Sequence, residues 1–175
     1  MKMMTIPLAA IHYAKTRKHL WAKYLVAVLF SGLCFFVMYK INLKDGVDIA
    51  EVFKDFINVQ INVVAILISF SIAIITILVS ADNPNIQRLK STDSKNCKPL
   101  AGGPLSLFQV LLSNVTYNVL IEVVYLAFLI ICVFLQLFVD VSIYKILMAV
   151  CVFFIFHILH ILLESVSQMY LTFWK

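Results

Sequence analysis

The sequence predicts an all-α polytopic membrane protein with four transmembrane helices and with both termini in the cytoplasm. Of its 175 residues, 63% are hydrophobic and only 13% are charged, and the mean hydropathy is +1.00. Soluble domains carry about 25% charged residues, and a chain this short cannot bury four long apolar runs in one soluble core. The runs are apolar on all sides and longer than the roughly 10-residue strands of a membrane barrel, so helices are expected.

Residues 1–23 are expected to form a basic arm at the cytoplasmic face and its lipid interface. A short apolar stretch at 6–14 is interrupted by His12, and basic residues follow it where the cleavage site of a signal peptide would lie. The arm is therefore expected to stay uncleaved. Its basic and aromatic side chains are predicted to bind anionic lipid headgroups. These anchors are Lys15, Arg17, Lys18, Trp21 and Lys23.

The remainder, 24–175, is predicted to form one four-helix transmembrane domain. A bilayer core requires about 20 apolar residues per helix. The predicted spans are about 20–41, 56–80, 116–139 and 143–163. Before the second span, the apolar spacing from Asp48 to Phe56 favours a short interfacial helix.

A polar loop at 81–107 is expected between the second and third spans, on the cytoplasmic side. Within it, an asparagine followed by a proline at 83–84 is typical of a helix start, so a short helix is predicted over 84–90. A new helix is expected to begin near Pro104 and to continue into the third span. Residues 140–142 should form a tight turn before the fourth span, which is expected to continue as helix into the cytoplasm.

The distribution of basic residues predicts the orientation. Of the 14 lysines and arginines, ten lie in the arm, in the 81–107 loop and at the C-terminus, and four lie on the opposite side. Cytoplasmic segments of membrane proteins carry the excess of basic residues. Both termini and the loop are therefore predicted to face the cytoplasm.

Small and polar residues occupy one face of the second span. At about 100° per residue they form a single stripe, which favours either a seam for close helix packing or the lining of a pore. The residues proposed for this seam or pore are Asn58, Asn62, Ser69, Thr76 and Ser80, together with Gln136 of the third span.

A second group of polar residues lies on the third and fourth spans. The short turn between them makes an antiparallel hairpin, and pairing about Val141 places Glu122 level with His160. We expect a buried polar network of Glu122, His157, His160, Glu164 and Asn118. This network is interpreted as a structural hydrogen-bonded cluster, as a proton- or voltage-responsive element because histidine titrates near neutral pH, or as a metal site formed by His157, His160 and Glu122.

Enzyme signatures are missing from the sequence. It has no HExxH, GxSxG, phosphate-loop or dinucleotide motif, and its four cysteines include no CxxC pair and predict neither a zinc site nor a disulfide framework. A non-enzymatic protein without a cofactor is therefore expected. The basic arm lies beside aromatic residues and is expected to contact lipid, so no direct binding to nucleic acid is predicted.

The layout resembles the small four-span membrane subunits of bacterial anti-phage defence systems, of the Kiwa membrane-subunit type. The resemblance is carried by the end of the polar stripe at 80–85, by the polar loop after it and by the polar-striped hairpin of spans three and four. Accessory membrane proteins of CRISPR systems have a similar layout. The resemblance implies an oligomeric membrane sensor or effector with a cytoplasmic protein partner, located in a bacterial inner membrane. The alternatives are a small ion channel or proton-coupled transporter, and a membrane-embedded metal-dependent enzyme.

Overall fold

The computed structural model describes residues 5–17, 20–40, 48–94, 97 and 103–173. These residues form helices and connecting turns, with no β-strand among them. The helices are α1 (Thr5–Thr16), α2 (Leu20–Lys40), α3 (Ile49–Ser80), α4 (Pro84–Ser91), α5 (Leu107–Leu135) and α6 (Val141–Phe173). Four of them, α2, α3, α5 and α6, are long and apolar enough to cross a membrane. The predicted fold class, all-α with four membrane-spanning helices, is confirmed.

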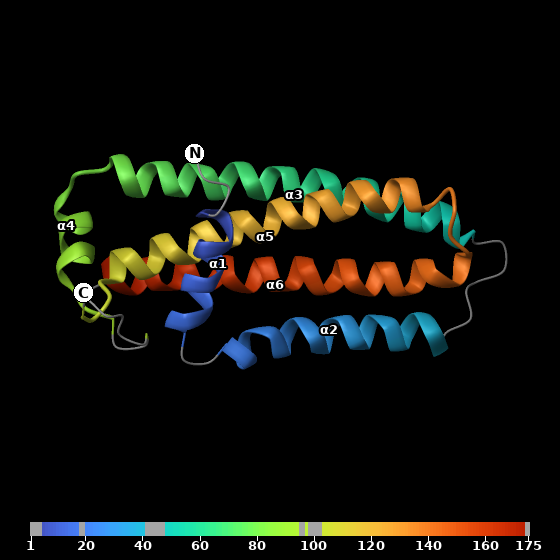
Figure 1. Ribbon diagram of the computed structural model, residues 1–175, viewed down its shortest axis with the longest axis horizontal. Helices are drawn as coiled ribbons and strands as arrows, with labels where there is room; N and C mark the ends of the chain where they lie inside the picture. Colours follow the sequence, from blue (N-terminus) through green and yellow to red (C-terminus); the bar gives the residue numbers. More distant parts are fainter. Residues whose placement is uncertain (1–4, 18–19, 41–47, 95–96, 98–102, 174–175) are drawn as a thin grey trace.

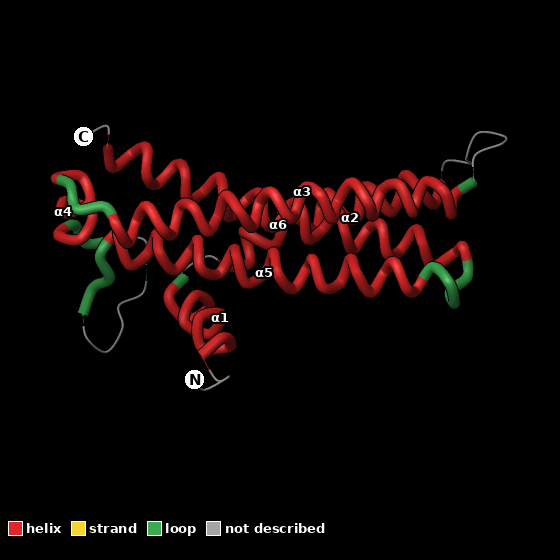
Figure 2. Tube along the Cα trace, turned by 90° about the horizontal axis from the view of Figure 1, so that it is seen from above, coloured by secondary structure: helices red, strands yellow, loops and turns green. Residues whose placement is uncertain are grey.

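The four long helices run up and down beside one another, as Figure 1 shows. Helix α6 packs between α2 and α5, and α3 packs mainly on α5. Helices α3, α5 and α6 extend beyond the first turn of α2 on the side where α4 lies (Figure 1). Helix α1 projects from the side of the bundle, across the direction of the long helices (Figure 2).

The helix starts follow local capping signals. Asp48 accepts a hydrogen bond from the backbone N–H of Ala50 at 2.8 Å and begins α3. No break follows, so the predicted interfacial helix is the first part of α3 and not a separate element. Ser106 and Gln109 form a reciprocal capping box at the start of α5.

The short helix predicted at 84–90 is present as α4. The Asn83 side chain accepts from the backbone N–H of Ile86 at 2.9 Å, and Pro84 occupies the first turn, where no donor is needed. Ile86 and Leu89 are buried against α3 and α5. Helix α4 therefore closes one end of the bundle.

The hairpin of α5 and α6 turns earlier than predicted. Helix α5 ends at Leu135, four residues before the expected limit, and α6 begins at Val141. The Tyr144 hydroxyl donates to the carbonyl of Gln136 at 3.1 Å and closes the turn. Gln136 therefore serves the turn through its backbone.

The largest buried cluster lies among α3, α5 and α6. Aromatic rings stack across the helices: Phe53 on Tyr144, with ring centroids 4.7 Å apart, and Tyr125 on Phe154, at 5.1 Å. Helix α2 lies outside this cluster. Its side chains are mostly exposed and apolar, as expected of a helix that faces lipid.

The packing of α2 on α6 is open to a direct test. The Ser31 hydroxyl donates to the carbonyl of Ala149 at 2.7 Å, whereas a Cβ atom at Gly32 would meet no atom within 4 Å. In a variant without the native cysteines, Ser31→Cys with Ala149→Cys is expected to cross-link on mild oxidation, and Gly32→Cys with Ala149→Cys is not. Equal cross-linking of the two pairs, measured by mass spectrometry, would place α2 elsewhere.

Candidate functional site

The N-terminal helix α1 docks on α5 through an aromatic stack. The ring of Tyr13 lies on the ring of Tyr117, with centroids 3.9 Å apart and an angle of 3° between the planes. Tyr13 is 1% exposed, and Ala10, Ile121 and Ile161 pack around it. Burial raises the pKa of the Tyr13 phenol, and the Glu164 carboxylate raises it further. The phenol is therefore a neutral hydrogen-bonding group at any physiological pH.

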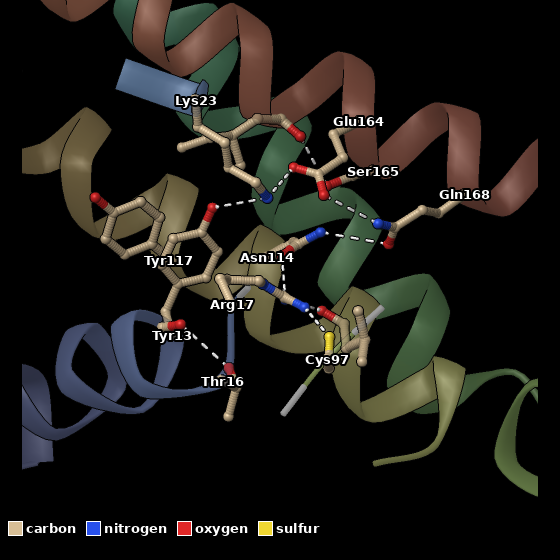
Figure 3. A network of polar contacts seen from close by, with 12 residues as sticks. Tyr13, Thr16, Arg17, Lys23, Cys97, Asn114, Tyr117, Glu164, Ser165 and Gln168 are labelled. Carbon is tan, nitrogen blue, oxygen red and sulfur yellow. Dashed lines mark hydrogen bonds and ion pairs between the residues drawn. The ribbon is translucent and has the colours of Figure 1, made fainter. Parts of the chain in front are cut away.

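Arg17 follows α1 and inserts its guanidinium into the protein. It donates hydrogen bonds to the Sγ atom of Cys97 at 2.7 Å, to the carbonyl of Val110 at 3.0 Å and to the Asn114 side-chain oxygen (Figure 3). The residue is only 4% exposed, and its charge also lies over the ring of Tyr13. The predicted headgroup contact of Arg17 is therefore wrong, because the protein encloses the side chain.

A second cation, Lys23, joins the start of α2 to α6. Its ammonium group forms an ion pair with Glu164 and donates to the Tyr13 hydroxyl at 3.4 Å. Gln168 donates to the other oxygen of Glu164 at 3.1 Å and accepts from Asn114 at 3.4 Å (Figure 3). Lys23 therefore takes part in a half-buried ion pair within the protein, in place of the predicted headgroup contact, and this polar chain links α1, α2, α5 and α6.

Of the other predicted anchors, Lys15 and Trp21 are exposed, and Trp21 keeps 89% of its surface free. Their exposure is compatible with the predicted contact with lipid headgroups. Lys18 lies outside the described residues.

His157 is part of a hydroxyl-rich cluster. The hydroxyls of Tyr24 and Tyr117 are 3.0 Å apart, and the Tyr117 hydroxyl is 3.4 Å from Nε2 of His157. The ring of Tyr24 stacks on the imidazole, with centroids 4.6 Å apart. The Nδ1 atom of His157 has no hydrogen-bond partner among the described residues. Tyr117 therefore connects His157 to the network of Arg17 and Lys23, because its ring stacks on Tyr13 and its hydroxyl contacts the imidazole.

The pair predicted between Glu122 and His160 is not formed. One carboxylate oxygen of Glu122 accepts from Ser71 of α3 at 3.0 Å and from Asn118 at 2.8 Å, and the other has no partner among the described residues. The predicted pairing of the two helices about Val141 is nonetheless correct. Asn114 contacts Gln168 and Phe128 contacts Phe154 across the hairpin, and these pairs are equally distant from Val141 along the chain. The error is in direction: Glu122 faces α3 instead of α6.

The predicted network is therefore divided in two. Glu122 and Asn118 lie between α3 and α5, whereas Glu164 and His157 belong to the cluster around Arg17 and Lys23. The proposed metal ligands His157, His160 and Glu122 are not brought together. The described residues contain no group of three histidine, cysteine, aspartate or glutamate side chains that could hold a metal ion.

The polar stripe of α3 lies on the outside of the helix bundle. Asn58, Asn62, Ser69, Thr76 and Ser80 are all exposed. The three hydroxyl groups donate to backbone carbonyls one turn earlier in α3, at 2.6–3.0 Å. The buried face of α3 is the opposite one and includes Phe53, Ile57, Val64, Ser71 and Leu78. The stripe is thus not a packing seam within one chain.

Several central residues of the site escape sequence reasoning. Residues 5–16 are only weakly apolar, so the sequence does not indicate that Tyr13 is buried. Ser71 differs from the serines and threonine of the stripe only in its position around α3. The four-residue spacing of Tyr13 and Arg17 is the available signal, because residues four apart lie on the same side of a helix and of its immediate extension.

Comparison with known proteins gives no relative for this arrangement: no protein family, no curated protein and no solved structure matches the chain.

Arg17→Ala is expected to release α1 from α5. The change leaves buried acceptors of Val110 and Asn114 without their donor, and hydrogen bonds to charged groups contribute about 1.5–3 kcal/mol. We expect a loss of at least about 2 kcal/mol in stability and faster reaction of Cys97 with a hydrophilic maleimide, measured by mass spectrometry. Lys15→Ala, at an exposed position of α1, is the control. It should change stability by no more than about 0.5 kcal/mol and leave the labelling rate of Cys97 unchanged. Unchanged labelling of Cys97 in Arg17→Ala would contradict the docking.

Proposed function

We propose that the protein is a homo-oligomeric subunit of a membrane sensor or effector that works with a cytoplasmic protein partner in bacterial anti-phage defence. The observation that carries the proposal is the unequal construction of the two ends of the bundle. Helix α4 and the extended ends of α3, α5 and α6 lie at one end, and α1 and the Arg17 network lie against the bundle in the same half. At the other end, α5 and α6 are joined by a short turn.

The end that carries α4 is proposed to face the cytoplasm. Among the described residues, five basic side chains lie toward this end (Lys15, Arg17, Lys23, Arg88 and Lys90) and three lie at the opposite end (Lys40, Lys54 and Lys145). This charge difference has the sign of the positive-inside rule. A partner would therefore find its binding surface at the α4 end.

The chemistry of α4 suggests an acidic partner surface. Arg88 and Lys90 are exposed, and Lys90 also lies over the ring of Phe108 at 5.4 Å. Charges of one sign steer a partner of the opposite sign and contribute to its specificity. The resemblance to Kiwa-type membrane subunits suggests a defence protein made by the same system.

Oligomerisation is proposed to bury the polar stripe of α3. The side chains of Asn58 and Asn62 are exposed on α3, and most of the residues around them on this helix are apolar. An amide group that faces hydrocarbon without a hydrogen-bond partner costs free energy. Small and polar residues let two transmembrane helices approach closely and bond to each other. A second copy of α3 offers the matching surface.

A small ion channel is the second candidate function, and the same stripe favours it. If three or more copies placed this face around an axis, the amides and hydroxyls of α3 would line a water-filled path. Ion flux through liposomes that contain the purified protein separates the two functions, since a packing seam conducts nothing.

The oligomer can be tested by cysteine cross-linking in membranes. Ser69→Cys lies in the centre of the stripe, and Phe70→Cys, also exposed but on an apolar face, is the matched control. In a variant without the native cysteines, Ser69→Cys is expected to give covalent dimers and Phe70→Cys is not. Native mass spectrometry that detects only a 19.9 kDa chain in mild detergent would exclude the oligomer.

The defence function can be tested by phage plating in cells that carry the gene with its genomic neighbours. Arg88→Glu combined with Lys90→Glu is expected to restore plaque formation to the level of cells without the gene. The two substitutions make the docking surface on α4 acidic, so it repels an acidic partner. Lys54→Glu, an exposed lysine of α3 at the opposite end, should keep protection. Immunoblotting of membranes checks that all variants accumulate. Equal protection by all of them would reject the proposed docking end.

A further inference from the structure

The carboxyl group of Glu122 lies in a buried polar cluster between α3 and α5. Ser71 and Glu122 are 0% exposed and Asn118 is 1% exposed. The Ser71 hydroxyl donates to Oε1 of Glu122 at 3.0 Å, and Nδ2 of Asn118 donates to the same oxygen at 2.8 Å. Nδ2 of Asn118 also donates to the Ser71 hydroxyl at 3.4 Å. The donors of this cluster are therefore directed at Oε1 of Glu122 and at Ser71.

The cluster contains more hydrogen-bond acceptors than donors. Oε2 of Glu122 and Oδ1 of Asn118 are buried and have no hydrogen-bond partner among the described residues. A buried acceptor that has lost its bonds to water costs free energy until a donor reaches it. Two acceptors cannot satisfy each other, so the cluster lacks one donor.

The carboxyl group of Glu122 also has no positively charged partner. Its two hydrogen bonds come from neutral groups, and the described part of the chain shows no ion pair between Glu122 and His160. The other titratable side chains of the surrounding helices contact other groups. These contacts are Tyr13 with Lys23, Arg17 with Asn114, Lys23 with Glu164, Tyr125 with Gln60 and His157 with Tyr117. A carboxyl group that is removed from water without a cation is far more stable as the neutral acid than as the anion.

We propose that Glu122 is a proton-binding site, in which Oε2 carries the proton and donates it in a hydrogen bond to Oδ1 of Asn118. One proton removes the negative charge and supplies the missing donor, so both unpartnered acceptors are satisfied together. Oε1 is then the carbonyl oxygen, and it keeps its hydrogen bonds from Ser71 and Asn118. Asn118 and Glu122 lie one turn apart on α5, and their polar groups already meet through Nδ2 and Oε1.

The bound proton links the contact between α3 and α5 to pH. When the protein unfolds, Glu122 enters water, where a glutamate is ionised at neutral pH. Unfolding therefore releases this proton, and a rising pH favours the unfolded state. The site is independent of the proposed function, since it uses none of the residues assigned to the oligomer or to the partner surface.

Infrared spectroscopy of the purified full-length protein in mild detergent tests the site directly. The carbonyl stretch of a neutral carboxylic acid lies apart from the bands of carboxylates and of backbone amides. The chain has three glutamates, Glu51, Glu122 and Glu164, and their bands are identified by labelling the side-chain carboxyl carbon of glutamate with ¹³C. We expect one acid band at neutral pH that the label shifts. Glu122→Gln should remove it, and Glu51→Gln, the same substitution at an exposed position, should keep it.

The hydrogen bonds predict a second infrared result. Ser71→Ala removes one of the two donors to Oε1, and a carbonyl that accepts fewer hydrogen bonds absorbs at higher frequency. The acid band should therefore move to higher frequency in Ser71→Ala without disappearing. This variant keeps Glu122, so the result does not depend on whether Glu122→Gln folds.

Thermal unfolding tests the link to pH. In Glu122→Gln an amide N–H takes the place of the acid O–H, so the variant should unfold at a temperature no lower than that of the wild type at neutral pH. As the pH rises from mildly acidic to mildly alkaline, the unfolding temperature of the wild type should fall relative to that of Glu122→Gln.

Three results would overturn the site. The first is a wild type without an isotope-sensitive acid band at neutral pH, which would mean that Glu122 is ionised. The second is an acid band that survives Glu122→Gln or that does not move in Ser71→Ala. The third is a Glu122→Gln protein that fails to fold or unfolds well below the wild type at neutral pH, because such a site requires the negative charge.

Discussion

Polar side chains in the apolar interior have no water to bond, and the protein meets this constraint by collecting them on α5. Asn114, Asn118 and Glu122 form a buried stripe along this helix. Each neighbouring helix brings a complementary group to it: Arg17 follows α1, Ser71 comes from α3 and Gln168 from α6. These hydrogen bonds lie on several sides of α5, so they determine where α1, α3 and α6 pack around it.

The fold could be predicted from sequence because its signals are local. A helix that spans a membrane is defined by its own length and apolarity, and a short helix such as α4 is defined by its own cap at Asn83. The short turn at the end of the α5–α6 hairpin is also a local feature, and it determines which residues of α5 and α6 lie at the same level. These features require no knowledge of which helix lies next to which.

The site could be predicted only in part, because its geometry depends on neighbours. The spacing of Glu122 and Asn118 indicates one face of α5 but does not say whether α3 or α6 covers it. Arg17 is misjudged for a similar reason. Its charge suggests the surface, whereas its acceptors, Val110 and Asn114, lie 93 and 97 residues further along the chain. The polar faces of α3 and α5 look alike in sequence, yet one is exposed and the other buried.

The order of the helices has a consequence for biogenesis. Helix α2 precedes the other three long helices described here, and its packing surface and the partner of its Lys23 are both on α6, which follows α3 and α5. During synthesis α2 is therefore made well before the helix on which it packs, and it stays without this partner while α3 and α5 are made. A nascent chain that stops before α6 leaves α2 without its packing surface and Lys23 without Glu164.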